Sequence, residues 1–294
     1  MFNLVKMDLY RMVHSVSFKV MLFVVAAVAF FTIGMTSYDV KNSQEQAENT
    51  VSQAELQEES SEQVSEEGAK VVLEIGFTMD TDYGWGTEAP FSEIMNENFK
   101  SRILLLLCVI FVPIFVHAEY KNGYIKNIAG QLPNRGVLAA SKLVAVAVQV
   151  LILFAGYMFF SAIAGKIFFG DAIVFTNMGG LLRYTVLHYL VHLAVSYIVL
   201  MLTILARGSA LPLTYGILCS TTFTALLYSG INMLISVITG KDTFDIGLYT
   251  PEMNVMYITA DMNSEALIRV LLVGGIYALA TAVLSVVIMK KRDV

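Results

Sequence analysis

Two histidines lie four residues apart in an apolar stretch of this chain, a spacing that puts both imidazoles on one helix face, where they could bind one metal ion. They belong to a row of polar residues at every fourth position: Tyr184, His188, His192 and Ser196. A zinc site needs three or four protein ligands, and neither a carboxylate nor a third histidine lies nearby in the sequence. We therefore expect no metal. Hydrogen bonding between helices is our first interpretation of the row and a substrate-facing role the second.

The next apolar stretch carries a comparable polar row: Thr221, Thr224, Tyr228 and Asn232. Polar side chains in such stretches face other helices or a water-filled path, because polar groups are costly in lipid. The two rows are the candidate lining of a translocation path.

Signatures of catalysis are missing from the sequence. Gly240-Lys241 is followed by Asp242 without a phosphate-binding loop, and there is no HExxH, no CxxC and no serine elbow. Cys108 and Cys219 both fall within apolar stretches, where we expect them to be inert small hydrophobes. The chain is therefore predicted to be no enzyme and to carry no cofactor.

The elements that must position these residues are membrane-spanning helices. The chain is 56% hydrophobic and 15% charged, whereas about 25% charged residues is usual in soluble domains. A helix needs about 20 apolar residues to cross a bilayer. Six stretches qualify: 18–35, 103–118, 143–164, 186–205, 211–238 and 267–289. The predicted fold is an all-α integral membrane protein with six transmembrane helices.

Several of these stretches have local features. The first exceeds the core of a signal peptide, so we expect it to be retained as a span. Pro113 should kink the second, and the fifth is long enough to bend near its end. Small residues on one face of the sixth should let another helix approach closely: Gly274, Ala278 and Ala282. No Asp or Glu lies inside a stretch, which argues against an ion-coupled carrier.

Basic residues predict the orientation. Of the 19 Lys and Arg residues, 11 lie on the side that holds both termini, against three acids, which leaves 8 basic residues and 21 acids on the other side. By the positive-inside rule both termini are cytoplasmic, in a multi-pass protein of the cell membrane.

Three regions follow. Residues 1–38 hold an amphipathic interfacial helix (1–17) and the first span. Residues 39–100 form an acidic external loop domain, interpreted as a solvated cap in preference to a collar that attracts cationic cargo, with a strand expected at 71–79. Residues 101–294 hold the remaining spans, and the apolar connection 239–266 is expected to re-enter the membrane from outside.

The stretch 119–142 is the internal cytoplasmic segment large enough to hold a partner protein. It carries four basic residues against one acid, Glu119. Together with the six spans and the opening residues 6–18 (KMDLYRMVHSVSF), the run Glu119-xxx-Gly123-xx-Lys126-Asn127, followed by Asn134-Arg135 and Lys142, resembles the permease subunits of ABC-2 type transporters.

The resemblance implies a coupling helix after the second span that docks on a separate ABC ATPase. Its expected coupling residues are Glu119, Tyr120, Gly123, Lys126, Asn127, Asn134 and Arg135. Two ATPase subunits, which hold ATP and Mg, would work with two permease subunits, identical or different, in the lipid membrane, with no nucleic acid. The implied function is transport, and export in particular, of an amphipathic peptide, antibiotic or lipid-like substrate. The long acidic loop departs from many members and favours peptide cargo.

Alternatives stay open at this point. The chain could be an ATPase-independent channel or carrier, or a structural or immunity protein that binds a toxic peptide at the outer surface. Within the coupling segment, Glu119 and Gly123 are expected to shape the elbow. Lys126 and Arg135 either pair with acids on the ATPase or only anchor the loop inside.

Overall fold

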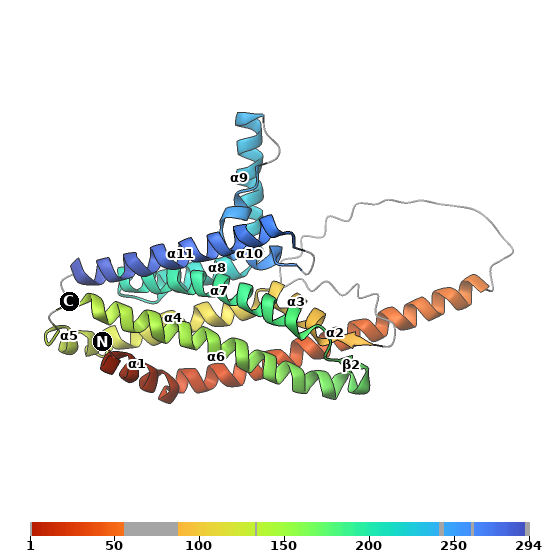
Figure 1. The fold of residues 1–294 in the computed structure, drawn as a ribbon, viewed down its shortest axis with the longest axis horizontal. Helices are drawn as coiled ribbons and strands as arrows, with labels where there is room; N and C mark the ends of the chain where they lie inside the picture. The colour runs from red at the N-terminus through yellow and green to blue at the C-terminus, as the bar shows by residue number, and fades with distance from the viewer. Residues whose placement is uncertain (1, 56–87, 133, 241–243, 260–261, 292–294) are drawn as a thin grey trace.

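The computed structural model describes residues 2–55, 88–132, 134–240, 244–259 and 262–291. Its long helices lie roughly along one axis, and α1, α5 and the end of α11 meet at one end of the bundle (Figure 1). The helices are α1 (Phe2–His14), α2 (Val16–Glu55), α3 (Phe91–Lys100), α4 (Ile103–Lys121), α5 (Tyr124–Ala129), α6 (Gly136–Phe168), α7 (Met178–Ala206), α8 (Ala210–Ser220), α9 (Phe223–Thr239), α10 (Pro251–Tyr257) and α11 (Ser264–Lys291). Two short 3-10 turns, η1 (Gly170–Ala172) and η2 (Ile246–Tyr249), complete the helical part.

Five helices are long and apolar enough to cross a membrane: the part of α2 over Val16–Lys41, and α4, α6, α7 and α11. The count rises to six if α8 and α9 form one span. The protein is therefore an all-α, multi-pass membrane-type chain. Pro113 lies inside α4, which continues through it as a single helix.

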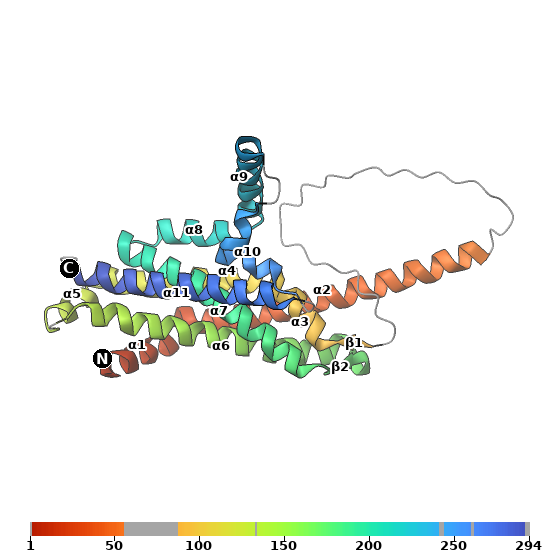
Figure 2. The ribbon, with the colours of Figure 1, turned by 45° about the horizontal axis from the view of Figure 1, so that its top comes forward.

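The fifth apolar stretch differs from the expected long helix with a bend near its end. It breaks between α8 and α9, closer to its middle, and the two helices are bent by 75°. At the break Thr221 leaves the helical region, with φ −108° and ψ 170°. In both views α9 stands away from the bundle (Figures 1 and 2). Much of its apolar surface is exposed, including Leu226, Met233 and Val237.

At the end of the bundle away from α1 and α5, α2 continues as a helix past Lys41 to Glu55 and extends beyond the other spans (Figure 1). The strand expected at 71–79 lies outside the described residues. In the described part the one sheet is a parallel pair of two-residue strands, β1 (Ala89–Pro90) and β2 (Ile173–Val174). Short helical segments η2 and α10 occupy the connection before α11.

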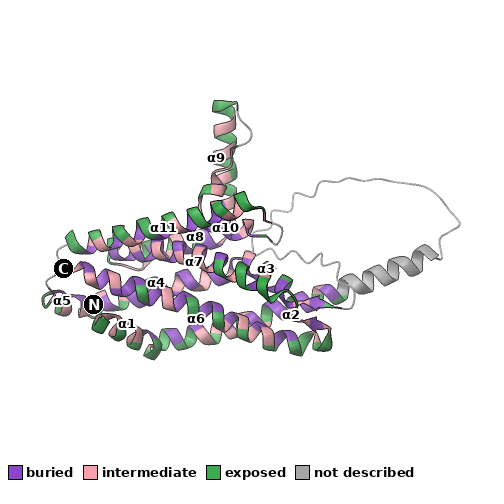
Figure 3. Ribbon diagram, in the orientation of Figure 1, coloured by how far each residue is buried: buried purple, intermediate pink, exposed green. Residues whose placement is uncertain are grey.

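The core lies between α2, α4, α6, α7 and α11, while the outward faces of these helices remain apolar and exposed (Figure 3). This is the distribution expected of helices whose outer faces meet lipid. The small-residue face of α11 packs within the same chain, since a Cβ added at Gly274 would lie 2.9 Å from Cγ of Leu190 on α7. The close approach predicted for this helix is therefore made to α7.

Candidate functional site

The segment after α4 turns sharply into the short helix α5. Gly123 makes this turn with φ +67°, a backbone conformation that side chains with a Cβ rarely adopt. A Cβ at this position would meet no atom within 4 Å, so the backbone angle, not crowding, favours glycine. Ile125 and Ala129 of α5 are buried against the bundle, and Asn127 is exposed. The helix thus rests on an apolar edge and presents a polar one.

Directly behind α5 lies a cluster of four charged side chains from three helices, which we call the charge cluster: Asp8, Arg11, Glu119 and Lys142. Glu119 and Lys142 are fully buried and Asp8 is 2% exposed. Glu119 accepts from Arg11, with 3.1 Å between Nη1 and Oε1, and pairs with the ammonium of Lys142 through its other oxygen. Lys142 Nζ also lies 3.8 Å from Asp8 Oδ2. The formal charges sum to zero, which is what burial of ions requires.

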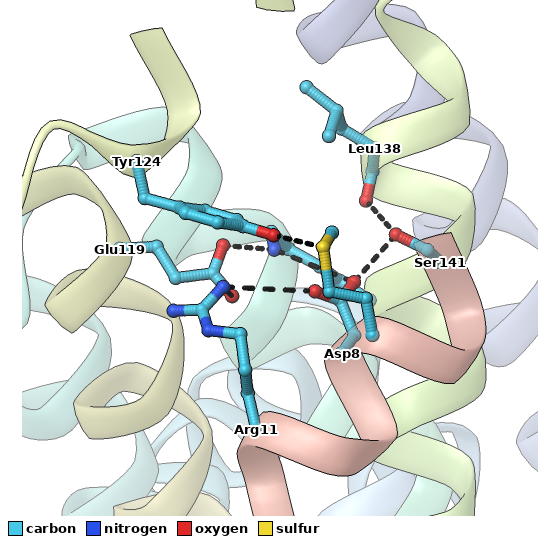
Figure 4. A network of polar contacts seen from close by, with 8 residues as sticks. Asp8, Arg11, Glu119, Tyr124, Leu138 and Ser141 are labelled. Atoms are coloured by element: carbon cyan, nitrogen blue, oxygen red, sulfur yellow. Dashed lines mark hydrogen bonds and ion pairs between the residues drawn. The ribbon is translucent and has the colours of Figure 1, made fainter. Parts of the chain in front are cut away.

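Neutral side chains extend the cluster to α5 and α6 (Figure 4). The hydroxyl of Ser141 donates to Asp8 Oδ2 at 2.7 Å. The guanidinium of Arg11 lies 3.9 Å from the ring centre of Tyr124, the first residue of α5. The Tyr124 hydroxyl donates to Sδ of Met7 at 2.7 Å, and burial raises the pKa of this phenol. Helices α1, α4, α5 and α6 are therefore joined at one point.

The predicted coupling residues take different places around this point. Glu119 is interior, whereas Asn127 and Asn134 are exposed, and Tyr120 and Arg135 are partly exposed. Asn134 Oδ1 accepts from the backbone N–H of Gly136 at 3.0 Å, at the start of α6. Lys126 belongs to α5 by its backbone, and its side chain lies outside the described part.

Asp8 and Arg11 are members of the site that the sequence pattern does not predict. Asp8 is four residues from both Leu4 and Met12 and lies on the face of α1 that packs against the bundle. Lys142 belongs to the predicted cytoplasmic segment, but α6 begins at Gly136 and buries it. Their spacing relative to apolar neighbours was the available signal.

The second polar row holds the broken stretch to the connection that follows it. Arg102 Nη1 donates to the backbone carbonyl of Thr221 at 2.7 Å and to Oγ1 of Thr224 at 3.1 Å. The Tyr228 hydroxyl donates to Glu252 of α10. Arg102 is itself 3% exposed, with φ +62°. This end of the molecule thus has its own polar network, which fastens α9 to α10.

Asp245 extends that network. It accepts from Asn232 Nδ2 at 2.8 Å and from the Tyr257 hydroxyl at 2.9 Å. Burial opposes the charged form, but the hydrogen bonds from Asn232, Gly247 and Tyr257 outweigh it and hold the pKa of Asp245 below its ordinary value. Burial, together with the bond to this carboxylate, raises the pKa of Tyr257 to about 12.

The first polar row is buried on α7. His188 and His192 are fully buried, with His188 near the ring of Phe99 (5.2 Å between centroids) and His192 near Phe154 (5.0 Å). His192 Nδ1 lies 2.7 Å from the carbonyl oxygen of His188. Among the described residues, no group of three or more His, Cys, Asp or Glu side chains is arranged to hold a metal ion. The row is therefore part of the packed interior, and a path along it would require α6 and α7 to separate.

Comparison with models of known protein families gives no match, and comparison with curated protein sequences gives no significant match either.

Proposed function

We propose that this chain is the membrane subunit of an ABC-2 type transporter, which exports an amphipathic peptide, antibiotic or lipid-like substrate. Two copies, or one copy and a related permease, work with two ATPase subunits in the cell membrane. Both termini and α5 face the cytoplasm, where ATP is hydrolysed by the partner.

The observation that carries this proposal is the charge cluster behind α5. Its ion pairs join α1, α4 and α6 around the buried Glu119 and Lys142, and α5 is attached to them through Tyr124, whose ring centre lies 3.9 Å from the Arg11 guanidinium. Breaking a buried ion pair by removing one partner costs about 3–5 kcal/mol. A force applied to α5 would therefore move α1, α4 and α6 together instead of bending the turn.

The exposed edge of α5 and the loop after it suits a docking partner. Asn127, Gln131 and Asn134 are exposed. Polar side chains of a partner would find several amides there. The interior of the apolar stretches contributes no carboxylate for an ion gradient, so the energy must come from such a partner.

A second candidate function rests on a different observation. Helix α2 continues past Lys41 to Glu55, so the described start of the acidic region is a helix that extends from the first span. A protein of this form could bind a cationic toxic peptide outside and confer immunity without moving it. That function needs neither α5 nor a partner.

A co-purification experiment separates these functions. The tagged chain is purified from its source cells in mild detergent, and any ABC ATPase that is retained is identified and quantified. Asn127→Trp combined with Gln131→Trp places two bulky side chains on the exposed edge and should lower bound ATPase at least tenfold, about 1.4 kcal/mol of binding free energy. Thr176→Trp, an exposed position at the other end, is the matched control and should bind normally.

If the double variant binds as much ATPase as the unaltered chain, the proposal that the ATPase docks at α5 is overturned. If no ATPase binds the unaltered chain, flux into liposomes that contain the chain alone would instead favour a channel. Protection that survives loss of the ATPase but requires residues 41–69 would favour the immunity function.

A further inference from the structure

A groove between α2 and α4 remains outside the function proposed above. It has a volume of about 400 Å³, within the range of roughly 300–1,000 Å³ that is usual for ligand sites. Its walls are apolar: Val16, Val20 and Val24 come from α2, and Leu107, Ile110 and Ile114 come from α4. Of the lining residues Ser17 is polar, and it is the second residue of α2, close in sequence to the end of α1.

The dimensions of the groove match one lipid leaflet. Val16 and Val24 are eight residues apart on a helix, which is about 12 Å of axial length. One leaflet contributes about 15 Å of hydrocarbon, half of the bilayer core. A helix of equal length and a diameter of about 10 Å would fill roughly 900 Å³, more than twice the groove. An acyl chain therefore fits the groove better than a helix from another protein does.

Lys121 lies beyond one end of this groove, on the same face of α4. Leu107, Ile114 and Lys121 are spaced by seven residues, two helical turns, and so lie on nearly the same face of α4. Lys121 is exposed and lies roughly 10 Å beyond Ile114 along the helix, at the level expected for lipid headgroups. The acid nearest to it on α4 is Glu119, which is buried and paired within the charge cluster. The charge of Lys121 is therefore not neutralised from its own helix.

His117 lies between the groove and Lys121 on α4. Its Nδ1 atom is buried and has no hydrogen-bond partner among the described residues. Because this atom faces the protein interior, the lipid contacts rest on the apolar walls for the tail and on Lys121 for the headgroup, in that order along α4.

We propose that the groove between α2 and α4 is a binding site for one anionic phospholipid, whose acyl chain lies between the two helices and whose phosphate meets Lys121. The site prefers a net negative headgroup, since a choline group would be repelled by the same ammonium. It does not depend on transport or on an ATPase partner.

Native mass spectrometry of the full chain in mild detergent tests this proposal. The protein is given equal amounts of phosphatidylglycerol and phosphatidylcholine with the same acyl chains, and retained lipid is counted. Lys121→Gln should lower the preference for phosphatidylglycerol about fivefold, the factor one basic residue contributes near an anionic surface. Val20→Trp, which fills the groove, should lower retention of both lipids. Lys19→Gln removes an exposed cation at the same end of α2, away from the lining, and should change nothing.

Ile114→Trp fills the groove from the opposite wall and should reproduce the effect of Val20→Trp, which separates occupancy from any folding defect of one variant. Lipid retention in Lys121→Gln and both tryptophan variants equal to that of the unaltered protein would overturn the proposal. A change of the tryptophan variants from dimer to monomer, with lipid retention unaltered, would overturn it in favour of a second copy as the occupant.

Discussion

At the scale of single residues, the charge cluster makes Glu119 the most constrained side chain near α5. Each of its carboxylate oxygens has a cationic partner, Arg11 on one side and Lys142 on the other. Because the group is fully buried, water cannot replace a lost partner. The consequences of altering it should therefore be large.

Glu119→Gln leaves Lys142 with a weaker partner and should lower the free energy of unfolding by about 3–5 kcal/mol. Lys142→Met should have a similar effect. The double variant should lose less unfolding free energy than the two single variants lose together, because the two groups interact directly. Denaturant unfolding in detergent measures all three.

Glu97→Gln is the matched control. Glu97 pairs with Lys100 at 2.5 Å, but both side chains are about one-fifth exposed. Glu97→Gln should lower the free energy of unfolding by about 1 kcal/mol or less, as for other solvent-accessible ion pairs. An effect of Glu119→Gln no larger than that of Glu97→Gln would contradict the structural importance of the cluster.

Asp245 is a residue whose contribution should depend on pH. Its pKa is lower in the folded protein than in the unfolded chain, so its stabilisation is present above about pH 4, near the ordinary aspartate value, and is lost as the pH falls through the folded pKa. Thermal unfolding should show the native protein more stable than Asp245→Asn at pH 6, with the difference shrinking toward pH 3. A difference that stays constant over this range would show that the charge of Asp245 is not involved.

At the scale of elements, hydropathy predicts the long helices but not the break between α8 and α9. The stretch 211–238 is apolar on average, so its mean hydropathy shows no interruption, although Ser220, Thr221 and Thr222 gather at the break. At the break the carbonyl of Thr221 accepts a hydrogen bond from Arg102, which is 119 residues away in sequence. Such a long-range partner is invisible to a local pattern, and the same holds for Asp8 opposite Glu119 and Lys142.

Arg102→Met should loosen this break, since the Thr221 carbonyl and Thr224 hydroxyl lose their donor. Spin labels at Val237 of α9 and Leu279 of α11, both exposed, report the angle as a distance distribution. The distribution should broaden or shift in the variant. Arg183→Met, at an exposed position on α7, should leave it unchanged. A narrow, unshifted distribution in Arg102→Met would mean that packing alone holds the bend.

At the scale of the whole molecule, the polar networks lie at opposite ends and have different partners. One joins α1, α5 and two spans, and the other joins Arg102, α9 and α10. The location of the first was predictable as a basic segment between spans, because charge near an apolar stretch is visible in the sequence. The membership of α1 in this first network was not predictable, because a charged residue such as Asp8 is usually found at a solvated position. Helix α1 is thereby part of the bundle and more than an interfacial anchor.

Integration of α1 makes a prediction for hydrogen exchange. Asp8 accepts from Ser141 and lies 3.8 Å from Lys142, so Asp8→Asn should detach α1 from α6 while the spans stay folded. Amides of α1 should then exchange at least tenfold faster, which corresponds to about 1.4 kcal/mol of lost local stability. Amides of α7 and α11 should keep their protection. Lys6→Met, an exposed position on the same helix, should leave α1 as protected as in the native chain. Equal acceleration in both variants would mean that α1 is held by its contact with the membrane surface and not by the charge cluster, and the mechanical connection from α5 to the bundle would then involve α4 and α6 alone.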